Sequence, residues 1–388
     1  MIKLKGYSKL TNYLTFPLIV TIWIIFTYLT NGLYLSARNI SFIFLQIAEV
    51  SCISMGMAFV IISGNIDLSV GSVLGVTGAL AALLQVKILP QIFRSSGNDF
   101  IVTLFTVIIV LFFGALIGFW QGLWISYGKV PSFIVTMSGM FIFRGAALFI
   151  TKGITLRPMF QNFKFLGQAY IPKIFGFFIC GIIIVLIWTN WLIKNKREKI
   201  LNIPRKRNLI EILKYTSLSL MILIFTIILN FYRGFPIPVI IIIFLALVLN
   251  FVSKNTRFGR FTYATGGNAD ISALVGINVK LNTLLIFILI GILSSISGII
   301  FTARLDAGTT YAGEFYELSA IAACVIGGVS LFGGKGTILG AVVGSIILSS
   351  IENGMYMLNI EIPWQYMIKG LLIVIFVWLD INFRTKRS

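Results

Sequence analysis

The sequence predicts an all-α fold: a polytopic bundle of about 10 to 12 transmembrane helices, some of them short or broken. Hydrophobic residues make up 58% of the 388 positions and charged residues only 11%, whereas soluble domains carry about a quarter charged residues. The mean hydropathy is +0.99. Apolar runs recur along the chain, and lipid favours helices because every buried backbone N–H and C=O must be paired internally. We therefore expect one membrane domain over residues 1–388.

The apolar runs define the expected spans. They lie near residues 14–30, 40–63, 70–89, 101–125, 132–151, 174–193, 216–231, 236–253, 281–303, 317–332, 337–357 and 364–380. Lysines precede the first run and no small-residue cleavage site follows it, so we expect a retained span and not a signal peptide. The runs at 70–89 and 317–332 are short and interrupted by glycine, which favours half-helices or re-entrant segments.

Basic residues concentrate in the loops and give a net charge of +19. Such a charge can indicate nucleic-acid binding, but loop clusters favour the positive-inside bias and contact with anionic membrane lipids, and no nucleic acid. With the N-terminus inside, the cytoplasmic loops are 126–131, a basic insert at 194–215 and 254–280. The basic loop 152–173 falls outside and breaks the pattern. We expect both termini in the cytoplasm.

The cytoplasmic loop 254–280 contains a short predicted helix. Residues 269–275 can form it, with Asn268 as its N-cap and Gly276 as its stop. A short exposed helix between two spans is a handle that a soluble partner could grip. An ordinary solvated connector is the alternative, and composition alone leaves both interpretations open.

Polar residues inside spans are costly in lipid and therefore informative. Glu49 and Arg144 both fall near the middle of predicted spans. They can form a buried ion pair with each other or line a wet pathway, and we favour the ion pair. Asp67 and Ser69 precede the third apolar run, where short acceptors can cap a helix. Capping explains these two residues without ligand contact.

Two sets of glycines repeat every four residues, which indicates close helix packing. The sets are Gly114, Gly118 and Gly122, and Gly336, Gly340 and Gly344. Ordinary bundle packing is the main interpretation, and a sliding surface or a dimer contact is the alternative.

The glycine-rich run 327–337 resembles a nucleotide-binding P-loop only superficially. Val329 stands where that motif needs its first glycine, and Gly336 follows Lys335, so we expect no nucleotide site. Its glycines are expected to break a helix near the bilayer. The glycines expected to break or shape a helix in this way are Gly327, Gly328, Gly333 and Gly334 of this run, together with Gly71 near the start of the third apolar run.

The chain has no histidine, which excludes histidine catalysis and histidine metal sites. Cys52, Cys180 and Cys324 lie in apolar runs without CxxC spacing, so we expect small buried thiols and neither disulfides nor metal ligands. We expect no metal and no cofactor.

Four runs in the same order resemble the permease subunits of bacterial ATP-driven (ABC) importers of the ribose and xylose type. They are 63–72 (SGNIDLSVGS), 130–145 (VPSFIVT…FRG), 263–278 (YATGGN…GIN) and 318–336 (LSAIAACVIGG…SLFGGKG). The resemblance runs over residues 45–380 apart from 185–235, and Cys324 and the run 352–357 favour the xylose branch. Ser319 stands where the family usually has Asp, and Asn65 replaces a Gly.

The resemblance implies the ABC importer permease fold in a bacterial cytoplasmic (inner) membrane, moving a monosaccharide, D-xylose or another pentose. It implies no enzymatic activity, because a separate cytoplasmic ATPase subunit hydrolyses ATP. An extracytoplasmic sugar-binding protein would deliver the sugar, and a second copy of the chain would complete the pathway as a homodimer. Docking on the ATPase is expected through a coupling helix, at Asn268, Asp270, Ser272, Gly276 and Asn278.

A pathway for a released sugar needs weak, neutral contacts. The expected lining residues are Glu49, Ser54, Asn65, Gln121, Ser138, Glu317 and Ser319.

Two other classes of protein compete with the permease. A self-contained secondary transporter or channel would carry paired ion-coupling carboxylates or an inverted repeat, and the sequence shows neither. A membrane enzyme would need a catalytic cluster at the interface.

Overall fold

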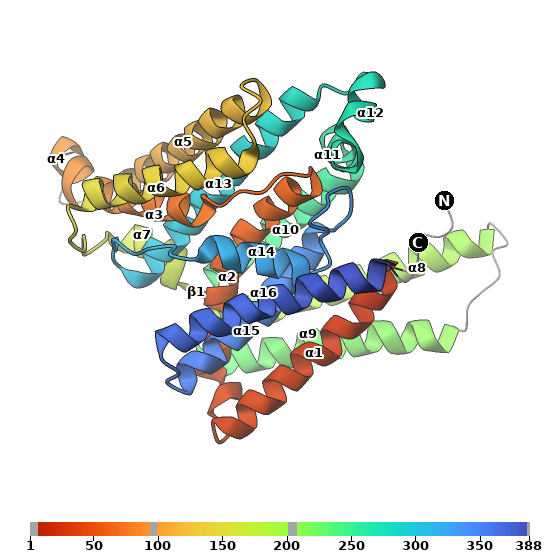
Figure 1. Ribbon diagram of the computed structural model, residues 1–388. Helices are drawn as coiled ribbons and strands as arrows, with labels where there is room; N and C mark the ends of the chain where they lie inside the picture. The colour runs from red at the N-terminus through yellow and green to blue at the C-terminus, as the bar shows by residue number, and fades with distance from the viewer. Residues whose placement is uncertain (1–6, 94–98, 201–207, 386–388) are drawn as a thin grey trace.

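The computed structural model describes residues 7–93, 99–200 and 208–385. Over these residues the protein is almost entirely helical (Figure 1). Nine helices of the described residues are long and apolar enough to cross a membrane. Three shorter apolar helices are Pro17–Leu29, Tyr316–Ile326 and Ile362–Trp378. Together they account for every predicted apolar run, which confirms the polytopic helical fold.

Figure 1 labels the helices and strands in chain order. The elements are α1 (Tyr7–Leu29), η2 (Leu33–Leu35), α2 (Ala37–Ile62), α3 (Val70–Leu83), η3 (Leu84–Ile88), α4 (Leu89–Phe93), α5 (Asp99–Ser126), α6 (Ser132–Thr151), α7 (Gln161–Gln168), β1 (Tyr170–Ile171), α8 (Lys173–Ile200), α9 (Asn208–Tyr232), β2 (Phe235–Pro236), α10 (Ile237–Asn255), α11 (Arg257–Gly267), α12 (Ala269–Leu274), α13 (Val279–Leu305), α14 (Tyr316–Ile326), α15 (Ile338–Met357) and α16 (Ile362–Thr385).

The prediction of a half-helix at 70–89 is wrong. α3 continues through the π-helical η3 into α4, and together they form one span of 24 residues. The glycines of α3 do not break the helix. They allow neighbouring segments to approach closely, because a Cβ at Gly75 would lie 2.6 Å from Ala312 O and a Cβ at Gly78 would lie 2.6 Å from Thr302 Oγ1. At 317–332 the prediction is confirmed, since α14 is short and a glycine-rich loop follows it.

α2 forms the centre of the bundle. Of its span window, 94% is buried, and it packs against α9, α10, α13, α14 and α15. This burial follows from its composition, because its apolar residues cover the whole circumference and not one stripe. The span that sequence reasoning placed at 40–63 is therefore the scaffold on which the other helices are assembled.

The hairpin of α8 and α9 lies at the periphery. Only 11% and 12% of their span windows are buried, and in Figure 1 the two helices reach away from the other elements. β1 and β2 pair antiparallel at the base of this hairpin. Residues 201–207 of the predicted basic insert lie outside the described residues.

The close packing predicted for the first glycine set is confirmed. A Cβ at Gly118 would lie 2.1 Å from Phe287 O, and one at Gly114 would lie 2.6 Å from Gly291 O, so these glycines bring α5 against the backbone of α13. The second set needs correction. Gly340 and Gly344 of α15 pack on α14 and the loop after it, but Gly336 precedes the helix at φ 150°.

The Gly118→Ala variant is expected to destabilise the protein by about 2 kcal/mol, because a methyl group would force two backbones apart. Thermal unfolding of the purified protein in detergent measures this loss. Gly145→Ala is the matched control, since a Cβ at Gly145 of α6 meets no atom within 4 Å. Equal unfolding temperatures for the two variants would contradict the packing role of Gly118.

The three cysteines are free and buried, as predicted. Cys52 donates to Leu293 O and Cys324 to Ser54 O, at sulfur–oxygen distances of 3.2 and 3.3 Å. Both thiols therefore act as small packing groups with weak hydrogen bonds.

Candidate functional site

The segment between α10 and α13 is built from helices with side-chain caps. Thr256 Oγ1 accepts from Gly259 N at the start of α11. Asn268 Oδ1 accepts from Ile271 N at 2.9 Å at the start of α12, which confirms the predicted N-cap. Asn278 then caps α13 in the same way. Sequence reasoning missed α11, although the threonine cap before it was a usable signal.

The outer face of α12 is apolar and exposed. Ile271, Leu274 and Val275 are 58%, 86% and 71% exposed. They are spaced i, i+3 and i+4, so they form one patch on one helical face. Leucine, isoleucine and valine in such a patch indicate a protein interface. We call these three residues the α12 patch.

Four of the five predicted docking residues are exposed beside the α12 patch, and one is not. The exposed residues are Asn268, Asp270, Gly276 and Asn278. Ser272 is buried and donates to Asn268 O at 2.7 Å, so it stabilises the helix and does not face a partner. Sequence reasoning missed the α12 patch itself, although its helical spacing was readable in the sequence.

The inner side of this segment packs on the glycine-rich loop 327–336. Tyr263 Oη of α11 donates to Gly336 O at 2.9 Å, and Gly334 N donates to Ile62 O at 2.8 Å. Burial raises the pKa of Tyr263 above its ordinary value, so its phenol stays a donor. A Cβ at Gly266 would overlap Ile62 O. α11 is therefore in direct contact with the end of α2 and with the loop that leaves α14.

The predicted helix break by glycine in this loop is confirmed. α14 ends at Ile326, and Gly328, Gly333 and Gly334 adopt φ values of 82°, 78° and 67°. Glycine is the residue that reaches these angles without a steric penalty. A Cβ at Gly327 would overlap Gly340 O. Backbone contact joins α14 to α15 here.

Gly276 also needs its positive φ of 86°, in a place where a Cβ would meet no atom within 4 Å. Gly276→Val is therefore expected to destabilise the protein by about 1–2 kcal/mol through backbone strain, which thermal unfolding of the purified protein in detergent measures. Gly276→Asn is the matched control, because asparagine tolerates this conformation. If both variants unfold at the same temperature, the positive φ of Gly276 carries no strain for a larger residue.

The predicted ion pair between Glu49 and Arg144 is wrong. Glu49 is fully buried and pairs with Arg304 at the end of α13, with Nε–Oε1 and Nη2–Oε2 distances of 2.5 and 3.1 Å. Tyr316 Oη at the start of α14 donates to Glu49 Oε2 at 3.2 Å. We call Glu49, Arg304 and Tyr316 the Glu49 clamp, because one carboxylate holds both ends of segment 306–315.

Arg144 holds the same segment near its middle. Its Nη1 donates to Ala312 O at 3.0 Å. Arg144 lies within α6, as expected for a residue inside a predicted span. Segment 306–315 is thus held by α2, α6 and α13 through polar contacts that cross the bundle.

Asp67, Ser69 and Gln121 form a buried chain. Asp67 Oδ1 accepts from Ser69 N and Ser69 Oγ at 2.7 and 2.6 Å, and Gln121 Nε2 donates to Ser69 Oγ at 2.7 Å. Ser69 makes no side-chain cap to α3, so its predicted role is wrong. Asp67 instead orders the turn before α3. Gln121 and Ser69 therefore join α5 to this turn and need no ligand.

The other predicted pathway residues are dispersed. Ser54 is buried and donates to Val50 O, Asn65 is half-buried and donates to Ser63 Oγ, and Ser138 is exposed on α6. Glu317 is buried beside Gly71, where a Cβ would lie 2.3 Å from its Oε2. These residues do not form a common site with one another.

Ser319 lies in a second polar cluster. Its Oγ donates to Glu352 Oε1 at 3.1 Å, and Lys369 Nζ lies 2.8 Å from the same oxygen. The three side chains come from α14, α15 and α16. Sequence reasoning missed Glu352 and Lys369 as site residues, although two ionisable residues inside apolar runs were a signal.

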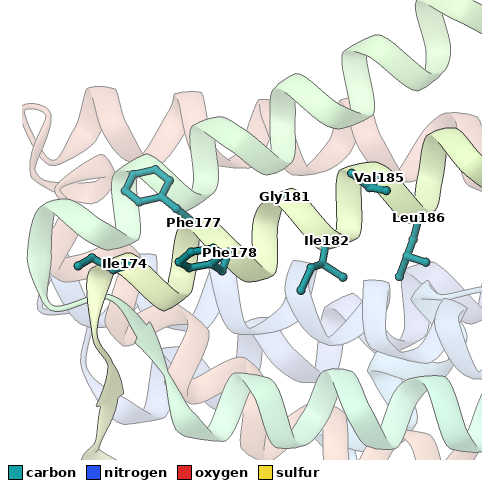
Figure 2. A pocket seen from close by; sticks show the side chains of 7 residues that line it. All are labelled: Ile174, Phe177, Phe178, Gly181, Ile182, Val185 and Leu186. Carbon is teal, nitrogen blue, oxygen red and sulfur yellow. The ribbon is translucent and has the colours of Figure 1, made fainter.

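A hollow of about 600 Å³ lies along α8, and Figure 2 shows the side chains that line it. Its lining residues are Ile174, Phe177, Phe178, Gly181, Ile182, Val185 and Leu186. A sugar site needs polar groups that fix orientation. This apolar hollow suits lipid chains and is not a candidate sugar site.

Among the described residues, no group of three or more Cys, Asp or Glu side chains is arranged to hold a metal ion.

Comparison with known proteins identifies the family. The profile of permease components of branched-chain amino acid transport systems matches residues 39–377. The chain is 40% identical to the xylose transport system permease protein XylH of Haemophilus influenzae over 100% of both chains. It is also 40% identical to that of Escherichia coli K12, over 97% of this chain and 94% of the relative.

The ribose import permease protein RbsC of Bacillus subtilis is 32% identical, over 92% of this chain and 89% of that protein. No solved structure matches the chain. The higher identity to the xylose relatives confirms the resemblance to sugar importer permeases and to their xylose branch. The chain therefore belongs to this family of transport-system permease components.

Proposed function

We propose that this chain is the membrane permease of an ATP-driven importer that moves a monosaccharide, D-xylose, into the cell. The observation that carries the proposal is the 40% identity to xylose permeases over the full length of the chain. The fold supports it. The bundle has many helices that can cross a membrane, and the loop between two of them carries the exposed α12 patch, on which a soluble subunit can dock.

In this proposal a separate ATPase subunit docks on the α12 patch. The permease has no part in ATP hydrolysis and converts movement of that subunit into movement of helices. α11 transmits the displacement, because its backbone touches both the end of α2 and the loop behind α14. Segment 306–315 and α14 then shift together, since the Glu49 clamp joins them to α2 and α13.

The remaining partners and the orientation follow the same proposal. A sugar-binding protein delivers the sugar from outside, and a second copy of the chain completes the pathway. The termini and the segment 254–280 face the cytoplasm, and basic residues of the cytoplasmic loops contact anionic lipid headgroups. Trp188, Trp191 and Tyr215 form an aromatic group near the end of the α8–α9 hairpin, where interfacial aromatic residues are expected. The whole chain is one membrane domain.

Reconstitution tests the proposal. Proteoliposomes with the permease, its ATPase subunit and its sugar-binding protein are expected to accumulate radiolabelled D-xylose only when ATP is supplied. Proteoliposomes with the permease alone are expected to show no concentrative uptake. Accumulation by the permease alone, driven by an ion gradient, would identify a self-contained secondary transporter instead.

A further inference from the structure

Three helices bring polar side chains to one place. The charged pair Glu352–Lys369 joins α15 to α16, and Ser319 of α14 donates to Glu352. Tyr356 follows Glu352 by four residues and Tyr366 precedes Lys369 by three, so each helix presents one charge and one tyrosine on the same face. We call these five residues the Glu352 cluster.

The Glu352 cluster adjoins the Glu49 clamp. Tyr316 of the clamp and Ser319 of the cluster lie three residues apart on α14. The ring of Phe315, one residue earlier, packs on Tyr366 with centroids 4.7 Å apart. The cluster is therefore attached to the short helix that the mechanism above moves.

The cluster is partly open, although it lies within the span. Lys369 is about 10 Å along the axis from the first residue of α16. The side chains of Lys369 and Glu352 are 13% and 12% exposed, and Tyr356 and Tyr366 are 53% and 42% exposed. The ion pair itself is thus mostly buried, with the two tyrosines open beside it. Charged residues at this depth are costly in lipid, so they face water or a protein-lined cavity.

The opposite side of α16 has lipid-facing character. Met367, Leu371 and Val374 are exposed apolar residues with helical spacing i, i+4 and i+7. α16 thus has an apolar side with Met367, Leu371 and Val374 and a polar side with Tyr366 and Lys369. Tyr366, on the side of α16 that carries Lys369, packs against Phe315, which directly precedes α14.

We propose that the Glu352 cluster is a transient contact site for the monosaccharide on its way through the permease. This inference rests on the proposed function. A carboxylate accepts hydrogen bonds from sugar hydroxyls, an ammonium donates to them, and a tyrosine ring packs on the C–H face of the sugar. Contacts from one open side bind weakly, which permits release.

Cysteine labelling tests whether the cluster is hydrated. Lys369→Cys and Tyr366→Cys are compared with Met367→Cys, and the three native thiols are buried, so background labelling is low. A charged thiol reagent that does not cross membranes is applied to proteoliposomes of the complete transporter, because thiolates form in water and not in lipid. Labelling of the two cluster positions is expected to be about tenfold faster than at Met367, and saturating D-xylose with ATP is expected to slow it.

Transport by charge variants tests the sugar contact. Glu352→Gln is expected to lower the maximal rate of D-xylose uptake about tenfold, the loss of one charged hydrogen bond. The apparent KM stays unchanged, because the separate binding protein sets it. Glu211→Gln is the matched control, since Glu211 also pairs with a lysine, at 2.6 Å from Lys194, on the peripheral hairpin.

A neutral double variant separates a sugar contact from a structural ion pair. Glu352→Gln combined with Lys369→Met removes both charges, and a purely structural pair replaced in this way leaves a folded, active protein. We expect a wild-type unfolding temperature with uptake still about tenfold reduced.

Restored uptake in the double variant, or equal labelling of all three cysteine positions, would overturn this inference. Labelling that D-xylose does not slow would also overturn it. These results differ from a failure of the proposed function, in which the unmodified complete transporter itself takes up no D-xylose.

Discussion

Replacing Glu49 with alanine is expected to destabilise the protein by about 3 kcal/mol or more, because Arg304 is left without its partner inside the bundle. Glu49 is fully buried and makes two contacts to the guanidinium and one to Tyr316. Removing one partner of a buried pair leaves an uncompensated charge, which costs more than the pair contributes. Thermal unfolding in detergent measures this loss.

The double variant Glu49→Leu/Arg304→Leu is expected to be more stable than either single variant, since it leaves no unpaired charge. Glu211→Ala is the control, because its pair with Lys194 is on the surface and such pairs contribute about 0–1 kcal/mol. A double variant as unstable as Glu49→Ala would show that the clamp acts through packing and not through charge.

The same clamp predicts a separate effect on transport. Tyr316→Phe keeps the ion pair and removes only the hydroxyl that joins α14 to Glu49. It is expected to change the unfolding temperature little and to raise the ATP hydrolysed per D-xylose imported, because α14 then follows α2 less closely. An unchanged ratio would mean that Tyr316 has no part in coupling.

Leu274→Glu is expected to abolish ATP-driven uptake and to release the ATPase subunit during purification. Leu274 is 86% exposed on the α12 patch. Full burial of a leucine side chain contributes about 2 kcal/mol, which corresponds to about 30-fold in affinity. A carboxylate buried in its place adds a desolvation cost. Co-purification and uptake are measured on the same preparation.

Leu33→Glu is the matched control for Leu274→Glu. Leu33 is 62% exposed in η2, on the side of the membrane that the proposed orientation places outside. It should retain the ATPase subunit, whereas Leu274→Glu should lose it. Retention in both variants would place the ATPase contact away from α12.

The Glu49 clamp and the α12 patch lie at the two ends of one series of contacts through the protein. In the proposed mechanism, the α12 patch receives the movement of the ATPase subunit, and the Glu49 clamp joins α14 to α2 in the centre of the bundle. Between them lie α11 and the glycine loop, where Gly266, Gly334 and Ile62 touch through their backbones. Because these backbones are in direct contact, the proposed mechanism expects a displacement of α11 to move the end of α2 and the glycine-rich loop with it.

Composition and local pattern determined much of this protein. The apolar runs specified the spans, because lipid requires each span to pair its own backbone groups. Local rules also determined the Asn268 cap of α12, the glycine break after α14 and the Gly114–Gly118 packing face. Each of these depends on residues within a few positions of one another or on a repeat along one helix.

The tertiary structure decided which polar residues meet. Glu49 pairs with Arg304, 255 positions away, and not with Arg144. Ser319 donates to Glu352 on a second helix, and Glu352 pairs with Lys369 on a third. Spacing along the chain carries no information on such contacts, since the partner of a buried charge depends on which helices pack together and at what depth. The sequence showed that these charges lie inside spans, and only the packing of α2, α13, α14, α15 and α16 assigned their partners.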